Sequence, residues 1–233
     1  MPSSLKQLPL ALKFRQGKDF AGFVCAPTSP LLPLLQSLAA GEQEQAYLYG
    51  EAGTGKSHLL EACVAEVERQ GKRACLLSAS LLKELSPAVL NGMEAGLSLL
   101  ALDDVEALAG RPEWEEALFH LYNRCREAQV TLLFGARHAP RQAGFGLPDL
   151  MTRLGAGPVL CLELPDEADL ARLLRQQARA HGLEVGDELV QFLLKRAPRQ
   201  PAALAQLLER LDQAALADGR RLSIPFVKQC LGW

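Results

Sequence analysis

Eight residues, GEAGTGKS at 50–57, constrain the fold of this chain more than any other stretch. The apolar run QAYLYG at 45–50 leads into them and a helical pattern begins near Lys56, so they lie between a predicted strand and a predicted helix. Glycines at these positions let the backbone curl until successive N–H groups point at one anion, and the helix N-terminus adds partial positive charge. The octet therefore predicts a phosphate-binding loop inside an α/β fold.

Two side chains in this loop carry the expected chemistry. Lys56 would place a positive charge against the β- and γ-phosphates, and Ser57 would offer its hydroxyl to Mg²⁺. We therefore expect ADP or ATP, with Mg²⁺, as the bound cofactors. For His58, in the first helical turn, packing or capping is an alternative to a nucleotide contact. The predicted nucleotide-binding residues are Gly50, Ala52, Gly53, Thr54, Gly55, Lys56, Ser57 and His58.

A pair of carboxylates supplies the second half of the predicted site. The apolar run LSLLALDD at 97–104 ends in Asp103 and Asp104, where the carboxyl end of a parallel strand borders a nucleotide crevice. We expect Asp103 to hold Mg²⁺, usually through water, and Asp104 to polarise an attacking water. An alternative for Asp104 is that it only caps the next helix.

Continuous apolar runs recur along the first two thirds of the chain. Continuous rather than alternating apolarity is typical of strands buried on both faces. Helical patterns at 57–71 and 113–128 lie between the runs, as βαβ units require. We expect an α/β fold with a five-stranded parallel sheet between helices. Its strands are predicted at 45–50, 73–79, 97–104, 130–136 and 158–164.

The pattern changes after Leu164, where helical stretches follow one another with Pro or Gly between them. This change predicts a small all-helical lid domain at 165–233, after an α/β domain at 18–164 and an N-terminal arm at 1–17. The helices are expected within 165–182, 186–198, 201–219 and 223–233.

Composition narrows the class of partners and the compartment. The net charge of −2 gives no general attraction to phosphate backbones, which argues against direct DNA binding. A membrane span needs about 18 to 20 consecutive apolar residues, and the sequence has no apolar stretch of that length. We also find no cleavable leader. The six cysteines are scattered without metal-ligand spacing, as in a reducing compartment. We expect a soluble, cytoplasmic protein.

Five segments together resemble one known family. They are KDFAGFV (18–24), YLYGEAGTGKSHLLEA (47–62), LALDDVEALAG (100–110), ALFHLYNR (117–124) and GLPDLMTRL (146–154). They are similar to segments of the DnaA-related AAA+ ATPases of bacterial replication initiation, which include the initiator DnaA and its regulatory inactivators. The resemblance runs over nearly the whole chain and implies a P-loop AAA+ domain followed by a helical lid.

Two features favour the inactivators over the initiators within this family. The chain ends soon after the predicted lid, without the helix-turn-helix domain with which initiators read DNA. QLPLAL at 7–12 resembles the Gln-Leu-x-Leu peptides that dock on the polymerase sliding clamp, so Gln7 would be a hydrogen-bonding anchor while Leu8 and Leu10 would enter apolar pockets. The protein would then contact DNA only indirectly, through the clamp. Packing of this leader on its own domain is the alternative.

The resemblance also assigns a role to Arg153, in GLPDLMTRL. In the family the arginine of this segment reaches into a neighbouring subunit's site. The resemblance implies that the clamp-bound, nucleotide-bound protein stimulates hydrolysis of ATP on DnaA and so down-regulates initiation. An arginine delivered in trans is worth about 10³ to 10⁵ in rate in well-studied systems. A surface salt bridge at a helix end is the alternative for Arg153.

Departures from the family pattern concern hydrolysis in the protein's own site. A small polar or acidic residue is expected near the γ-phosphate, but by spacing Arg137 or Ala136 stands there. Ala202 stands where the family places a lid arginine, and Arg199 is about one turn earlier. We therefore expect nucleotide binding with slow or undetectable turnover in cis.

Other assignments stay open on the sequence alone. Phe20, Phe23 and Val24 are candidates for the adenine pocket, with core packing as the alternative. A homodimer or higher homo-oligomer is compatible with the family. The rival function is a self-sufficient AAA+ ATPase acting as a helicase loader or initiator-type factor, which would turn over ATP by itself.

Overall fold

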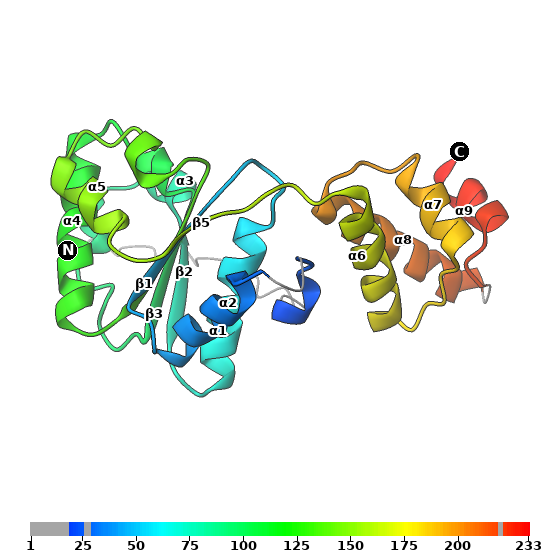
Figure 1. The fold of residues 1–233 in the computed structure, drawn as a ribbon, viewed down its shortest axis with the longest axis horizontal. Helices are drawn as coiled ribbons and strands as arrows, with labels where there is room; N and C mark the ends of the chain where they lie inside the picture. Colours follow the sequence, from blue (N-terminus) through cyan, green and yellow to red (C-terminus); the bar gives the residue numbers. More distant parts are fainter. Residues whose placement is uncertain (1–18, 26–28, 219–220) are drawn as a thin grey trace, which may run out of the picture.

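A five-stranded parallel sheet forms the centre of the computed structural model, which describes residues 19–25, 29–218 and 221–233 (Figure 1). Its strand order is β2-β3-β4-β1-β5, and every pair of neighbours is parallel. The expected sheet is therefore confirmed. The strands are β1 (Gln45–Tyr49), β2 (Ala74–Ser78), β3 (Leu99–Asp103), β4 (Thr131–Ala136) and β5 (Val159–Cys161).

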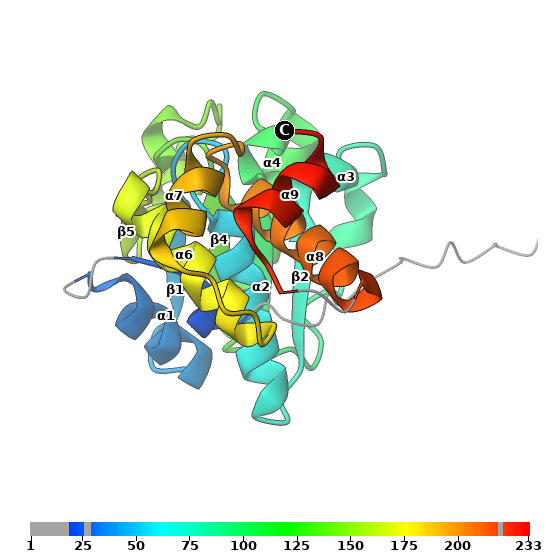
Figure 2. The ribbon, with the colours of Figure 1, turned by 90° about the vertical axis from the view of Figure 1, so that its right-hand side faces the viewer.

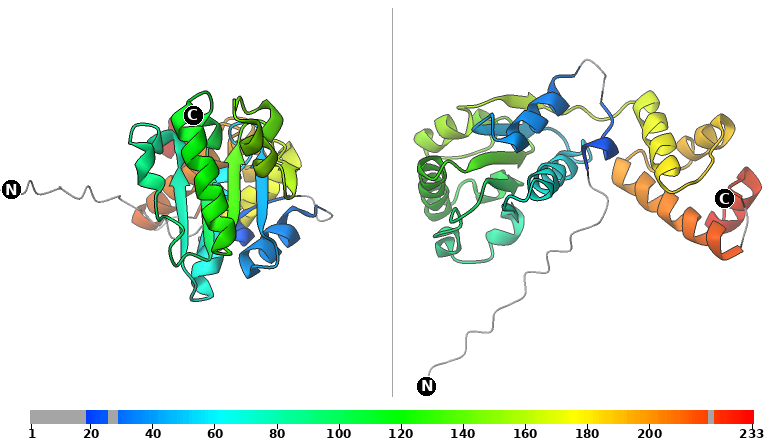
Figure 3. Two further views of the ribbon diagram at one scale, coloured as in Figure 1. Left: turned by 90° about the vertical axis from the view of Figure 1, so that its left-hand side faces the viewer. Right: turned by 90° about the horizontal axis from the view of Figure 1, so that it is seen from below.

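Helices cover both faces of the sheet, which explains why the strands are apolar throughout. Helices α1 and α2 cover one face, and α4 and α5 cover the other (Figures 1 and 3). Along β1, Ala46 and Leu48 enter the core beneath α1 and α2, whereas Tyr47 enters the core on the side of α4 and α5. Adjacent side chains on a strand point to opposite faces, so burial of both faces requires an unbroken apolar run. These helices are α1 (Leu31–Ala40), α2 (Lys56–Arg69), α4 (Pro112–Glu127) and α5 (Pro148–Leu154).

The segment between β2 and β3 was not predicted in detail and contains short elements. They are α3 (Ala79–Leu82) and the 3₁₀ turn η2 (Pro87–Leu90). Elsewhere the 3₁₀ turns are η1 (Phe20–Gly22), η3 (Val105–Leu108) and η4 (Pro140–Gln142). Elements this short lack the repeated periodicity on which a sequence prediction depends.

A helical lid follows the sheet (Figure 2). It has a core of its own, in which Leu174, Leu193 and Leu208 are buried. Its first helix begins with a capping box, because Asp166 and Asp169 each accept a hydrogen bond from the other's backbone N–H. The lid contains α6 (Glu167–Ala180), α7 (Asp187–Leu194), α8 (Pro201–Asp218) and α9 (Ile224–Leu231). The exact division of the chain at Pro165 stays a prediction, and the predicted arm at 1–17 lies outside the described residues.

No helix in the described part of the chain is long and apolar enough to cross a membrane.

Candidate functional site

The loop from Gly50 to Ser57 connects β1 to α2, as the sequence predicted, and two of its glycines have left-handed backbone angles. Gly53 has φ +89° and Gly55 has φ +94°, a conformation that favours glycine. Gly50 is required for a different reason, because a Cβ there would lie 2.3 Å from the carbonyl oxygen of Leu162. The loop therefore packs directly against the segment that leaves β5.

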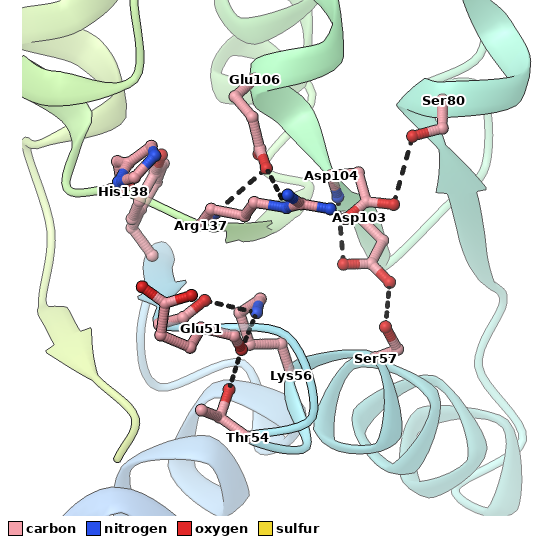
Figure 4. Close-up of polar contacts among 12 residues, drawn as sticks. Glu51, Thr54, Lys56, Ser57, Ser80, Asp103, Asp104, Glu106, Arg137 and His138 are labelled. Carbon is pink, nitrogen blue, oxygen red and sulfur yellow. Dashed lines mark hydrogen bonds and ion pairs between the residues drawn. The ribbon is translucent and has the colours of Figure 1, made fainter. Parts of the chain in front are cut away.

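The Lys56 side chain folds back over this loop (Figure 4). Its ammonium donates hydrogen bonds to the carbonyl oxygens of Gly50, at 2.6 Å, and Glu51, at 2.9 Å. The Thr54 hydroxyl also donates to Glu51, at 3.0 Å, and both Lys56 and Thr54 are buried. A buried cation at the start of a helix, surrounded by curled backbone, forms a strong anion site.

Ser57 and Asp103 are brought together as a candidate metal site. The Ser57 hydroxyl donates a hydrogen bond to Asp103 Oδ2, and the backbone N–H of Asp104 donates to Asp103 Oδ1 at 3.0 Å. A hydroxyl and a carboxylate are hard oxygen donors of the kind that Mg²⁺ selects, so these two residues fit that ion. Gly135 on β4 leaves room for them, because a Cβ there would lie 2.6 Å from Asp103 Oδ1.

Asp104 adopts a left-handed conformation, with φ +53° and ψ +40°. Its side chain accepts a hydrogen bond from the Ser80 hydroxyl at 3.2 Å (Figure 4). Asp104 occupies the N-cap position of η3 but makes no side-chain capping bond. Its predicted role in polarising water stays a prediction, and the contact with Ser80 had no signal in the sequence.

Arg137, the first residue after β4, contacts the carboxylate of Glu106. Glu106 Oε1 accepts a hydrogen bond from the Arg137 backbone N–H at 3.1 Å, and lies 3.9 Å from Arg137 Nε (Figure 4). Ala136, the alternative to Arg137 near the γ-phosphate, is fully buried in the sheet. Arg137 is thus held toward η3 by Glu106, a partner that the sequence reasoning missed.

Phe23, one of the three candidates for the adenine pocket, lies against the start of α2. The ring of Phe23 stacks on His58 with centroids 6.2 Å apart, and it contacts Gly55, where an added Cβ would lie 2.6 Å from the ring. His58 Nε2 lies 3.0 Å from the carbonyl oxygen of Asp19. Phe20 and Phe23 are partly buried against the core under α2, and Val24 is also partly buried. The base-pocket assignment stays a prediction.

The lid approaches the phosphate loop through the residues before α8. A Cβ on Gly53 would lie 3.9 Å from Cγ of Gln200. Arg199 pairs with Glu167 of α6, at 3.7 Å, and Ala202 lies exposed in the first turn of α8. Arg199 therefore directly precedes Gln200, the lid residue that approaches Gly53, and its own ion-pair partner, Glu167, also belongs to the lid.

Arg153 lies on α5, far from this loop. Gln45, the first residue of β1, donates to the carbonyl oxygen of Arg153 at 3.0 Å, whereas the phosphate loop follows the last residue of β1. The five residues of β1 span roughly 16 Å. The Arg153 side chain is exposed, and its Cζ lies 5.7 Å from the centroid of the Tyr122 ring.

Comparison with known protein families gives two matches. A family model for the bacterial DnaA ATPase domain matches residues 34–160, more than half of the chain. A model for the lid domain of Hda matches residues 166–231. The two matches adjoin near the start of α6.

Solved structures share the fold at low sequence identity. Domain III of the replication initiation protein DnaA from Thermotoga maritima has a TM-score of 0.77 at 20% identity, covering 94% of this chain and 97% of that one. AMPPCP-bound DnaA from Aquifex aeolicus has a TM-score of 0.69 at 22% identity, covering 84% of this chain and 65% of that one. The RuvB Holliday junction branch migration motor from T. maritima has a TM-score of 0.65 at 19% identity, covering 87% and 66%.

The contact between Gly135 and Asp103 makes a first prediction. Gly135→Ala should displace the Asp103 carboxylate and weaken Mg²⁺-dependent ADP binding by about tenfold, which is about 1.4 kcal/mol. Binding without Mg²⁺ should change much less. Titration with a fluorescent ADP analogue, with and without Mg²⁺, measures both. Gly186→Ala is the control, because nothing lies within 4 Å of a Cβ there. Equal losses with and without Mg²⁺ would contradict the assignment.

The ionisation of Asp103 makes a second prediction. Burial raises the pKa of Asp103, the hydrogen bond from Ser57 offsets part of this rise, and the Asp104 charge adds to it. A carboxyl whose pKa is higher in the folded state is destabilising when ionised, and this penalty disappears as the pH falls below the unfolded value of about 3.9.

Asp103→Asn should therefore raise the Tm of the nucleotide-free protein at pH 7, and the gain should shrink as the pH is lowered. Mg²⁺-dependent binding should be lost in the same variant. Thermal unfolding over a pH series measures the first effect. Asp187→Asn, at an exposed position on α7, is the control. A lower Tm for Asp103→Asn at pH 7 would show that the ionised carboxylate stabilises the fold.

Proposed function

Since this chain belongs to the family of DnaA-related AAA+ proteins, with the bacterial DnaA ATPase domain and an Hda-type lid, we propose that it is a nucleotide-bound adaptor acting on DnaA. In this proposal it docks on the polymerase sliding clamp and stimulates hydrolysis of the ATP bound to DnaA. The result is down-regulation of replication initiation. The observation that carries the proposal is the position of Arg153, exposed and at the opposite end of β1 from the protein's own phosphate loop.

Nucleotide binding rests on the donors of the loop and its neighbours. Lys56, now bonded to the carbonyls of Gly50 and Glu51, would bind phosphate oxygens, and the start of α2 would add partial positive charge. Ser57 and Asp103, whose side chains are hydrogen-bonded to each other, would hold Mg²⁺. The family resemblance and the AMPPCP-bound DnaA of A. aeolicus support this assignment. Mg²⁺, when bound, neutralises charge on the phosphates.

Slow turnover in the protein's own site follows from the residues around it. Arg137, which stands near the expected γ-phosphate position, lies against Glu106 and is not the small polar or acidic residue expected there to position water. Arg199 pairs with Glu167, and Ala202 has no polar group. Gln200 of the lid approaches Gly53 of the loop, so a bound nucleotide would bias the position of the lid against the loop. A nucleotide-dependent lid position is one means of regulating how α5 meets DnaA.

Arg153 performs the chemistry of the proposal in the partner's site. Its guanidinium stabilises the charge that develops on the transferred phosphoryl group when it enters a neighbouring active site. The Arg153 side chain is too far from the protein's own phosphate loop to act in cis, because β1, about 16 Å long, lies between the two. The exposed position on a short helix leaves the guanidinium accessible to such a neighbour.

We predict that Arg153→Ala lowers stimulated hydrolysis on DnaA by about 10²-fold or more. Its own ADP affinity should be unchanged, since the side chain does not contact the phosphate loop. The measurement is release of labelled phosphate from ATP-loaded DnaA in the presence of clamp loaded on DNA. Arg69→Ala, at the end of α2, removes an exposed arginine elsewhere and should have no effect. Full stimulation by Arg153→Ala would exclude Arg153 from the reaction.

The clamp-docking leader makes a separate prediction, although Gln7, Leu8 and Leu10 lie outside the described residues. Replacing Gln7 and Leu8 together by alanine should weaken binding to purified clamp by about tenfold or more, since anchor residues dominate such peptide contacts. Retention on clamp-coated beads measures this effect. A Gln70→Ala, Leu81→Ala variant, altered at two exposed positions of the same residue types, is the control. Unchanged retention of the leader variant would contradict clamp docking through this segment.

A further inference from the structure

The helix that carries Arg153 is too short to be stable by itself. α5 has 7 residues, about two turns, and isolated helices of this length are unstable in water. Its apolar face is anchored by Leu150 and Leu154, both fully buried. Apolar burial fixes which face of a helix points inward, but it is non-directional and defines the position along the helix axis less sharply than hydrogen bonds do.

A buried carboxylate fixes the start of α5. Glu115 of α4 is only 3% exposed and accepts hydrogen bonds from the backbone N–H groups of Gly146, at 2.9 Å, and Leu147, at 2.7 Å. It also accepts from the backbone N–H of Gly110, at 2.8 Å. N–H groups at the start of a helix have no hydrogen-bond partner within the helix, so a carboxylate that accepts from them satisfies these donors. Its negative charge also interacts favourably with the positive end of the helix dipole.

A buried amide fixes the other end of α5. Gln45 is 4% exposed, and its Nε2 donates to the carbonyl oxygens of Arg153, at 3.0 Å, and Leu154, at 3.4 Å. Its Oε1 accepts a hydrogen bond from the Tyr122 hydroxyl at 2.6 Å. Gly157 leaves space for this amide, because a Cβ there would lie 2.5 Å from Gln45 Cγ.

Tyr122 connects this network to the arginine itself. Burial raises the pKa of Tyr122, so its hydroxyl stays protonated and can donate to Gln45. Its ring lies 5.7 Å from Cζ of Arg153, within reach of a cation–π interaction. One buried side chain therefore contacts both the group that binds the Arg153 backbone and the Arg153 guanidinium.

We propose that Gln45, Tyr122 and Glu115 are positioning residues. They fix the position of α5 along its axis and the direction of the Arg153 side chain for its reaction in trans. This inference rests on the proposed function of Arg153. Their hydrogen bonds are directional where the apolar contacts of α5 are not, and they act at both ends of the helix. None of the three contacts the phosphate loop, so the effect reaches the partner's site without altering the protein's own nucleotide affinity.

Gln45→Met tests the inference, since methionine keeps the length of the side chain but cannot donate to the Arg153 carbonyl. At saturating adaptor, stimulated hydrolysis on DnaA should fall about tenfold, because small misplacements of a catalytic group are costly. The half-saturating adaptor concentration and the ADP affinity should change less than about twofold. Gln70→Met, on the exposed end of α2, is the matched control.

Tyr122→Phe provides a milder variant that keeps the ring and removes only the hydroxyl that binds Gln45. It should lower the maximal rate in the same way by about threefold, a loss of about 0.7 kcal/mol in transition-state stabilisation. If Gln45→Met fails to fold, the maximal rate of Tyr122→Phe tests the positioning role by itself. In an Arg153→Lys background both substitutions should have much smaller effects than in the native chain, because residues that act through one group are not additive.

The outcomes separate this inference from the proposed function. If Arg153→Ala still stimulates hydrolysis fully, the proposed function fails and the inference fails with it. If Arg153→Ala abolishes stimulation but Gln45→Met and Tyr122→Phe keep the full maximal rate, the positioning role is overturned and the function stands. Lowered thermal stability with an unchanged maximal rate would likewise identify the network as only structural.

Discussion

Strand β1 pairs in parallel with β4 on one side and β5 on the other, and the two functional ends of the molecule depend on this pairing. The carboxyl end of β1 leads into the phosphate loop, while Gln45 at its start binds the backbone of Arg153. A paired strand in the middle of a sheet cannot slide without breaking its ladder and turning its side chains to the wrong face. The distance between the phosphate loop and the backbone of Arg153 is therefore set by the sheet.

Buried polar groups do the rest of the positioning. Lys56, Asp103 and Glu115 have buried side chains that can carry charge, and each is held by hydrogen bonds within the protein. Such groups are costly to bury unless they are satisfied, so they specify one geometry where leucines would allow several. In this protein they occur at the phosphate loop and beside the helix of Arg153, the two regions on which the proposed function depends.

Sequence reasoning predicted the parts of this structure that repeat or that carry a motif. The continuous apolar runs gave the five strands, and the glycine-rich octet gave the loop before α2, because both depend on neighbouring residues in the chain. Contacts between distant segments could not be predicted in the same way. Gln45 and Arg153 are 108 residues apart, and nothing near either one indicates the other. Glu106 beside Arg137 and Ser80 beside Asp104 were missed for the same reason.

The proposed function requires that this protein keep its nucleotide while it stimulates hydrolysis in another protein's site. Single-turnover experiments with labelled ATP placed on only one partner test it most directly. With the label on DnaA, adding this protein and clamp on DNA should accelerate phosphate release strongly. With the label on this protein, release should stay slow whether or not DnaA is present. Comparable release from the nucleotide on this protein would contradict the account and identify it as a self-sufficient ATPase.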